Sequence, residues 1–82
     1  MKSYAMKFLK SHPEIKESDL DWMWDYCSSF PDLGGGLIKR LKDQGLSWRD
    51  LNFTCLEDLL RIYNNIETSV LNNLINDENE ND

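Results

Sequence analysis

Apolar residues recur every three or four positions along almost the whole chain, and strict alternation of apolar and polar residues never persists for long. This spacing is the period of an α-helix, in which residues i, i+3 and i+4 lie on one face. A chain of 82 residues can bury one core and not two. We therefore predict an all-α fold, a single compact bundle of four to six short helices with a longer C-terminal helix.

Proline and capping residues bound the first two predicted helices. A short helix begins near Ser3 and ends before Pro13, because the residue that precedes a proline disfavours the helical conformation. Ser18 and Asp21 have the spacing of a capping box, which predicts the start of a second helix. That helix is expected to end before Pro31 for the same reason as the first.

Glycines mark the next two turns. The run of three glycines at 34–36 predicts a turn or a loose helix start, since each costs about 1 kcal/mol against alanine inside a helix. Gly45 suits the left-handed residue that follows a helix, and Leu46 is then placed to fold back on Leu41. A third helix is therefore expected between these turns.

Two helix-start signals follow within a few residues. Ser47 with Asp50 forms one, and Thr54 with Glu57 forms another. They predict a one-turn helix followed directly by the long C-terminal helix. Trp48 lies at the first position of the small helix, where we expect its ring to close one end of the core.

The charge and the cysteines limit the class of protein. Residues 1–76 are predicted to be the helical domain, and residues 77–82 a flexible acidic tail. The net charge of −6 argues against direct binding to nucleic acid, whose affinity comes from basic residues at phosphates. Two cysteines are too few for a disulfide scaffold, and no segment is long and apolar enough for a membrane. We predict a cytoplasmic protein with no membrane association.

No constellation of residues for catalysis, metal binding or cofactor binding is recognisable. One histidine and two cysteines 28 residues apart match no zinc spacing. The glycine run followed by Lys39 and Arg40 lacks the remainder of a phosphate-binding fingerprint. We predict no enzyme activity, no metal and no cofactor. The alternative from another class is a small hydrolase or redox protein that uses Cys55, whose place at a helix start can lower a thiol pKa.

The second predicted helix carries more apolar surface than a small core can hide. On a helical projection its core-facing residues fill one arc, while Trp22 and Tyr26 lie on the far side. An exposed Trp-Tyr pair beside acids has the composition of a binding surface. We therefore predict that Trp22, Tyr26, Asp21, Asp25 and Glu17 contact a partner protein. The alternative is a central helix that packs on both sides.

The charged residues allow two further interpretations. The acidic row Glu17, Asp21 and Asp25, continued by Asp32, could imitate a phosphate backbone and block a nucleic-acid-binding protein. A secondary basic patch could pair with the second predicted helix of another copy of the chain, which would give a homodimer. Together with Arg49, the same patch could instead bind DNA or RNA. This patch consists of Lys39, Arg40 and Lys42.

The segment QGLSWRDLNFTCLEDLLRIY, residues 44–63, resembles the middle of sterile alpha motif domains, in which a short helix precedes a long terminal helix. The likeness covers about a quarter of the chain and implies self-association or partner binding through helix ends. The chain lacks the glycine that such domains place before the last helix, and we do not assign it to that family.

A small acidic chain of this kind suits an inhibitor or adaptor that masks another protein, such as an antitoxin, an immunity protein or a virus-encoded inhibitor. The alternatives are a nucleic-acid mimic and a self-associating structural module.

Overall fold

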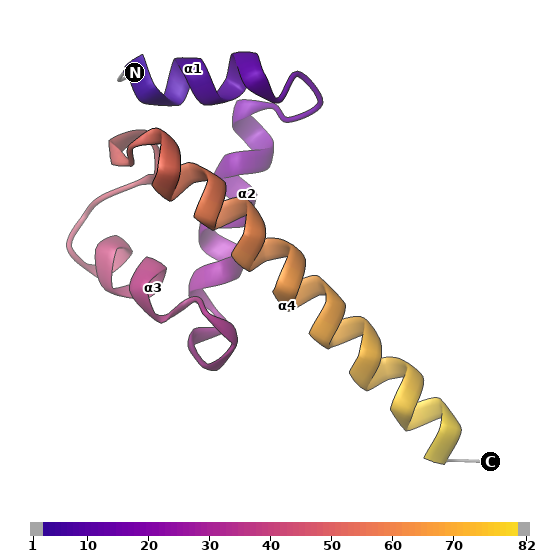
Figure 1. Ribbon diagram of the computed structural model, residues 1–82. Coiled ribbons are helices and arrows are strands. Elements are labelled where there is room, and N and C mark those ends of the chain that lie inside the picture. The colour runs from indigo at the N-terminus through magenta and orange to yellow at the C-terminus, as the bar shows by residue number, and fades with distance from the viewer. Residues whose placement is uncertain (1–2, 81–82) are drawn as a thin grey trace.

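The fold is entirely helical, as predicted. The computed structural model describes residues 3–80, with side chains described for residues 3–75. Its elements, in chain order, are α1 (Ser3–Ser11), α2 (Glu17–Ser28), the 3-10 turn η1 (Pro31–Leu33), α3 (Gly36–Asp43), the 3-10 turn η2 (Trp48–Asp50) and α4 (Phe53–Glu80). Figure 1 shows the long α4 as the element against which the rest of the chain is arranged.

The core lies where the first half of α4 meets the other helices. α2 contacts both α3 and α4, and α1 packs on α4. Each helix contributes apolar residues from one face, which is the pattern expected of amphipathic helices around a small core. The buried apolar residues are Ala5, Phe8, Leu20, Met23, Trp24, Cys27, Ile38, Trp48, Leu56, Leu59 and Ile66.

The start of α2 differs from the sequence prediction. The helix begins at Glu17, and the backbone N–H of Lys16 donates to the Asp19 carboxylate at 2.9 Å. Asp19 therefore accepts the backbone N–H of the cap residue, Lys16. The sequence had predicted that Asp21 would accept the N–H of Ser18 in a capping box. That assignment was wrong by two residues, because an acid three positions after the cap was also available at this earlier start.

The start of α4 also differs. The helix begins at Phe53, and the Asn52 side-chain oxygen accepts the Cys55 backbone N–H at 2.8 Å. Asparagine caps helices as well as threonine does, so the chain begins this helix earlier than the Thr54 and Glu57 signal indicated.

The turns follow the glycines. Gly34 has φ +109° and Gly45 has φ +84°, both in the left-handed region. A side chain at Gly35 would collide with the backbone carbonyl of Cys27, so glycine is needed where the chain passes the end of α2. After α3, the Leu46 N–H donates to the Leu41 carbonyl at 3.1 Å. The predicted C-terminal cap of the third helix is confirmed.

The small helix η2 delivers a tryptophan to the core, as predicted. The Ser47 N–H donates to the Asp50 carboxylate at 2.9 Å, and the Arg49 N–H donates to the Ser47 hydroxyl at 3.2 Å. These bonds fix the turn that points Trp48 inward, where its side chain is fully buried.

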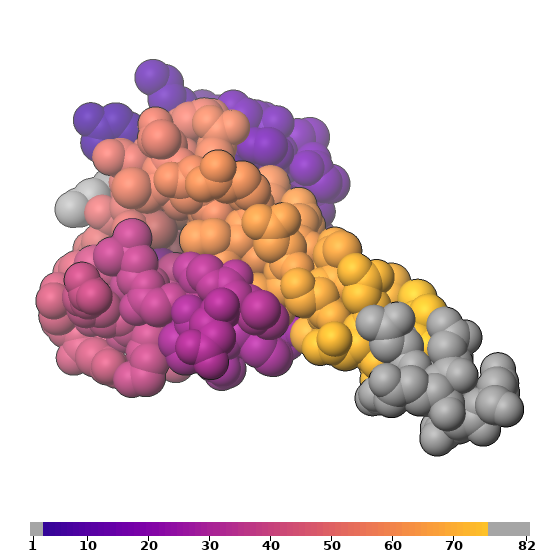
Figure 2. All heavy atoms as spheres, turned by 60° about the horizontal axis from the view of Figure 1, so that its bottom comes forward, coloured from indigo at the N-terminus to yellow at the C-terminus, as the bar shows by residue number. Residues whose placement is uncertain are grey.

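The second half of α4 projects from the remainder of the molecule, as Figures 1 and 2 show in orange and yellow. The molecule measures 51 Å along its longest axis and 19 Å along its shortest. The backbone of α4 runs to Glu80 and so includes residues 77–80 of the predicted acidic tail, while residues 81–82 lie outside the described part of the chain. The division into a domain and a tail stays a prediction.

Candidate protein-binding surface

Three aromatic side chains from two helices form a cluster on the side of the molecule. Trp22 and Tyr26 lie one turn apart on α2, and their rings stack at 4.6 Å between centroids with 15° between planes. Tyr63 of α4 meets both rings edge-on, at 5.5 and 5.8 Å. We call Trp22, Tyr26 and Tyr63 the aromatic surface. Its geometry combines the stacked and edge-on arrangements that aromatic pairs favour.

Within the aromatic surface, Tyr26 is partly buried and Trp22 is exposed. Tyr26 is half-buried and also packs against Phe30, with ring centroids 5.0 Å apart. Trp22 keeps 51% of its surface exposed. The stacking on Tyr26 therefore holds the indole in place without covering it. An indole that is fixed and still exposed can bind a partner with little loss of conformational entropy.

Both phenols of this surface stay protonated at neutral pH. Desolvation by burial raises the pKa of Tyr26 above its usual value of 10.0, and the neighbouring Glu67 carboxylate raises it further. The pKa of Tyr63 is raised for the same two reasons, in the same order. The hydroxyl groups therefore remain hydrogen-bond donors at neutral pH.

Asp21, which we predict to contact a partner, is bonded to two residues of η2. Its carboxylate accepts the indole N–H of the buried Trp48 at 2.6 Å and a guanidinium N–H of Arg49 at 3.0 Å. The Trp48 bond is the main cause that lowers the pKa of Asp21, and the Arg49 bond lowers it further against the opposing effect of desolvation. Asp21 thus fixes the position of a core tryptophan.

The other two acids of the row also have basic neighbours within the chain. Glu17 lies 3.8 Å from Arg49, and Asp25 lies 3.0 Å from Lys42. Arg49 in addition lies over the Trp48 ring, 4.3 Å from its centroid. The negative charge of the row is therefore partly offset at the surface, and exposed pairs of this kind contribute little to stability.

The secondary basic patch is brought together on α3. Lys39 pairs with Asp43 one turn later at 2.9 Å, and Lys42 pairs with Asp25 of α2. Arg40 is exposed. Two of the three residues thus already meet an acid of their own chain, in exposed ion pairs.

Sequence reasoning missed a second exposed surface on α4. Leu71, Leu74 and Ile75 retain 57%, 58% and 46% of their surface exposed, although their spacing continues the pattern of the buried residues upstream. We call these three residues the distal apolar row. A signal was present in the charges: Glu67 is the only acidic or basic residue between Arg61 and Asp77. Tyr63 was also missed, since its spacing identifies it only as part of the helix pattern.

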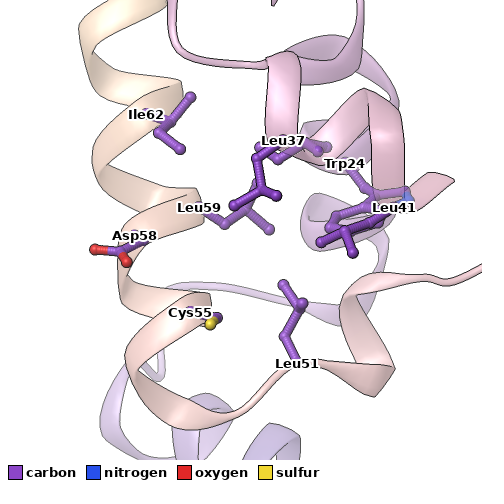
Figure 3. A pocket seen from close by; sticks show the side chains of 9 residues that line it. Trp24, Leu37, Leu41, Leu51, Cys55, Asp58, Leu59 and Ile62 are labelled. Carbon is purple, nitrogen blue, oxygen red and sulfur yellow. The ribbon is translucent and has the colours of Figure 1, made fainter.

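A small hollow of about 60 Å³ is lined mainly by residues of α3 and α4 (Figure 3). Its lining is apolar apart from the Cys55 thiol and the Asp58 carboxylate, and the latter pairs with Arg61 at 2.8 Å. No histidine lines it. His12, the one histidine of the chain, packs against Phe8 and lies 3.5 Å from Glu14. The hollow therefore gives the Cys55 thiol no imidazole base, which a cysteine nucleophile commonly uses.

The other thiol, that of Cys27 on α2, is fully buried. Desolvation raises its pKa to about 11, with a smaller contribution from Glu67, so it is a neutral thiol at physiological pH. Within residues 3–75, no group of three or more His, Cys, Asp or Glu side chains is arranged to hold a metal ion. None of the helices in the described part of the chain is both long and apolar enough to cross a membrane.

No family model, no curated protein and no solved structure matches the chain. The resemblance of residues 44–63 to sterile alpha motif domains thus receives no support from these comparisons.

Proposed function

We propose that the chain is a small protein-binding module, an inhibitor or adaptor that masks a partner protein through the aromatic surface. The observation that carries the proposal is the exposure of Trp22, which leaves half of an indole in water while the ring is held against Tyr26. Tryptophan and tyrosine dominate the binding energy of protein interfaces, and a fixed, exposed pair is the arrangement that such sites use.

The alternative of a nucleic-acid mimic has less support. A mimic needs carboxylates that are free to meet a basic groove, whereas Asp21 and Asp25 already accept bonds or ion pairs from Arg49 and Lys42. The homodimer through the basic patch has the same difficulty, because Lys42 is paired with its own α2. Binding at the aromatic surface does not require any ion pair of the chain to break first.

The proposal is tested by photo-cross-linking from inside the surface. Replacing Trp22 with the photoreactive residue benzoylphenylalanine, in cells of the native source, should yield an adduct with one partner protein after illumination. Tyr4 on α1 is the matched control, since it is an aromatic residue with the same 51% exposure. Adducts that are equally abundant from positions 22 and 4, or absent from both, would refute the proposal.

A second variant separates binding from folding. Trp22→Ser should abolish the partner adduct formed from an adjacent photoreactive position on α2, while changing the melting temperature by only a few degrees. A change of about 1 kcal/mol in a domain of this size corresponds to roughly 4–8 °C. Loss of the fold in Trp22→Ser would show that the ring is structural and would overturn the assignment.

A further inference from the structure

The distal apolar row extends the aromatic surface along α4. Tyr63, Glu67, Leu71 and Ile75 follow one another at intervals of four residues, which places them on one side of the helix. Leu74 lies beside this line. The row therefore begins at the aromatic surface and continues onto the part of α4 that projects beyond the other helices (Figure 2).

The composition of this segment is not that of a solvated helix. Helices that stand alone in water are normally rich in charge on every side, yet residues 62–76 contain one acidic residue and no basic one. Many of its residues are weak helix formers. They are Asn64, Asn65, Thr68, Ser69, Val70, Asn72 and Asn73. A segment of this kind gains most of its helical stability by packing against another surface.

The charges define what that surface can be. No basic residue follows Arg61, while Glu67, Asp77, Glu78, Glu80 and Asp82 follow it. A second copy that paired through the same segment would bring the same acids and no basic residue from its own residues 62–82. A nucleic acid or an anionic membrane would meet the same repulsion. A partner segment with an apolar face and flanking lysines or arginines complements both the row and the acids.

We propose that the distal apolar row docks a basic amphipathic helix of another protein. This inference rests on the proposed function and specifies which kind of segment the partner protein presents. The apolar face of the partner helix packs onto Leu71, Leu74 and Ile75, with the ridges of one helix in the grooves of the other. Its basic residues lie near Glu67, so that charge sets orientation and association rate.

The test uses a defined probe in place of the unknown partner. The probe is a synthetic 18-residue helical peptide with leucines at positions i, i+3, i+4 and i+7 and lysines elsewhere. Isothermal titration calorimetry should show one peptide bound per chain, with weaker binding as NaCl is raised from 50 to 500 mM. Backbone NMR shifts should change most at residues 67–75.

Two control peptides isolate the two parts of the recognition. One has the same composition with its leucines dispersed around the helix, and the other has glutamate in place of lysine. Neither should bind. Binding of the glutamate peptide as strongly as the lysine peptide would overturn the proposal, because it would show that apolar contact alone suffices.

A matched pair of variants locates the site. Leu71→Ser/Leu74→Ser/Ile75→Ser should weaken peptide binding at least about tenfold, the equivalent of about 1.4 kcal/mol. Tyr4→Ser/Met6→Ser, which removes apolar residues of similar exposure from α1, should leave the affinity unchanged. Equal affinity of the triple variant and the native chain would overturn the proposal. So would a dimer of the native chain, seen by sedimentation, that the triple variant abolishes.

The two proposals fail separately. Benzoylphenylalanine at position 22 reports on the aromatic surface in cells, and the peptide titration reports on the distal apolar row in solution. An adduct from position 22 without peptide binding would leave the proposed function standing and remove this inference. Absence of the adduct, with peptide shifts confined to residues 67–75, would remove the aromatic surface as the binding site and leave only the docking of a basic helix on the distal apolar row.

Discussion

The two halves of α4 carry apolar residues at the same helical spacing, but these residues are buried in the first half and exposed in the second. In the first half, on which α1 and α2 pack, Leu56 and Leu59 are fully buried. In the second half, Leu71 and Leu74 are more than half exposed. The helix period is unbroken between them, so the difference comes from what the remainder of the chain covers. One half belongs to the core, and the apolar residues of the other stay exposed to solvent.

If the proposed docking holds, this difference also separates folding free energy from binding free energy along one helix. Burying a leucine side chain is worth about 1.5–3 kcal/mol relative to leaving it exposed. The first half of α4 realises that free energy on folding. The second half can realise it only on binding a partner.

The strongest test of the comparison replaces one leucine from each half. Leu59→Ala should lower the free energy of unfolding by about 2–5 kcal/mol, because it creates a cavity in a packed core. Leu74→Ala should change it by no more than about 0.5 kcal/mol, as is usual for exposed positions. Urea unfolding followed by circular dichroism measures both. Similar losses from the two variants would show that the second half is packed within the folded molecule.

A smaller change in the free energy of unfolding is expected at Asp21, whose carboxylate on α2 accepts the indole N–H of the buried Trp48. Asp21→Asn keeps an acceptor for the indole but removes the charge, and should cost about 0.5–1 kcal/mol at pH 7 after allowance for solvent screening. Asp43→Asn, which removes an exposed pair with Lys39, is the control and should cost less.

The pH dependence of that cost has a definite sign. The folded-state pKa of Asp21 lies below the ordinary 3.8, so its contribution to stability is present above pH 3.8 and is lost as the pH falls through the folded value. The native chain and Asp21→Asn should therefore converge in stability in strong acid. A difference that persists unchanged at pH 2 would show that the charge is not its source.

The smallest effect is expected in the projecting half. Asn72→Ala and Asn73→Ala should each favour the local helix by about 0.5 kcal/mol. Hydrogen exchange of amides 70–76 should slow, while the global free energy of unfolding should stay unchanged, because that segment opens independently of the core. A parallel rise in global stability would mean that the two halves unfold together.

Periodicity and turn chemistry were sufficient to predict the helices, the cap at Gly45 and the burial of Trp48. The starts of α2 and α4 were predicted too late, because Lys16–Asp19 and Asn52 provide caps two residues before the signals that we used. The projection of α2 placed Trp22 away from the core, and its exposure agrees with that placement.

The candidate surfaces were harder to predict because they depend on pairs far apart in the chain. The Asp21–Trp48 hydrogen bond joins residues 27 apart, and no local pattern predicts it. The distal apolar row was missed for a related reason. A period of 3.6 identifies an apolar stripe but cannot say whether the chain is long enough to cover it.

The three tryptophans of the chain differ in their access to solvent: Trp48 is sealed, Trp24 is nearly so, and only Trp22 is half open. Soluble iodide can therefore quench the fluorescence of one indole while the emission of the other two persists. Because that indole belongs to the aromatic surface, its fluorescence reports on binding there without any added label. A partner that covers Trp22 should protect its fluorescence from iodide and shift the emission to shorter wavelength.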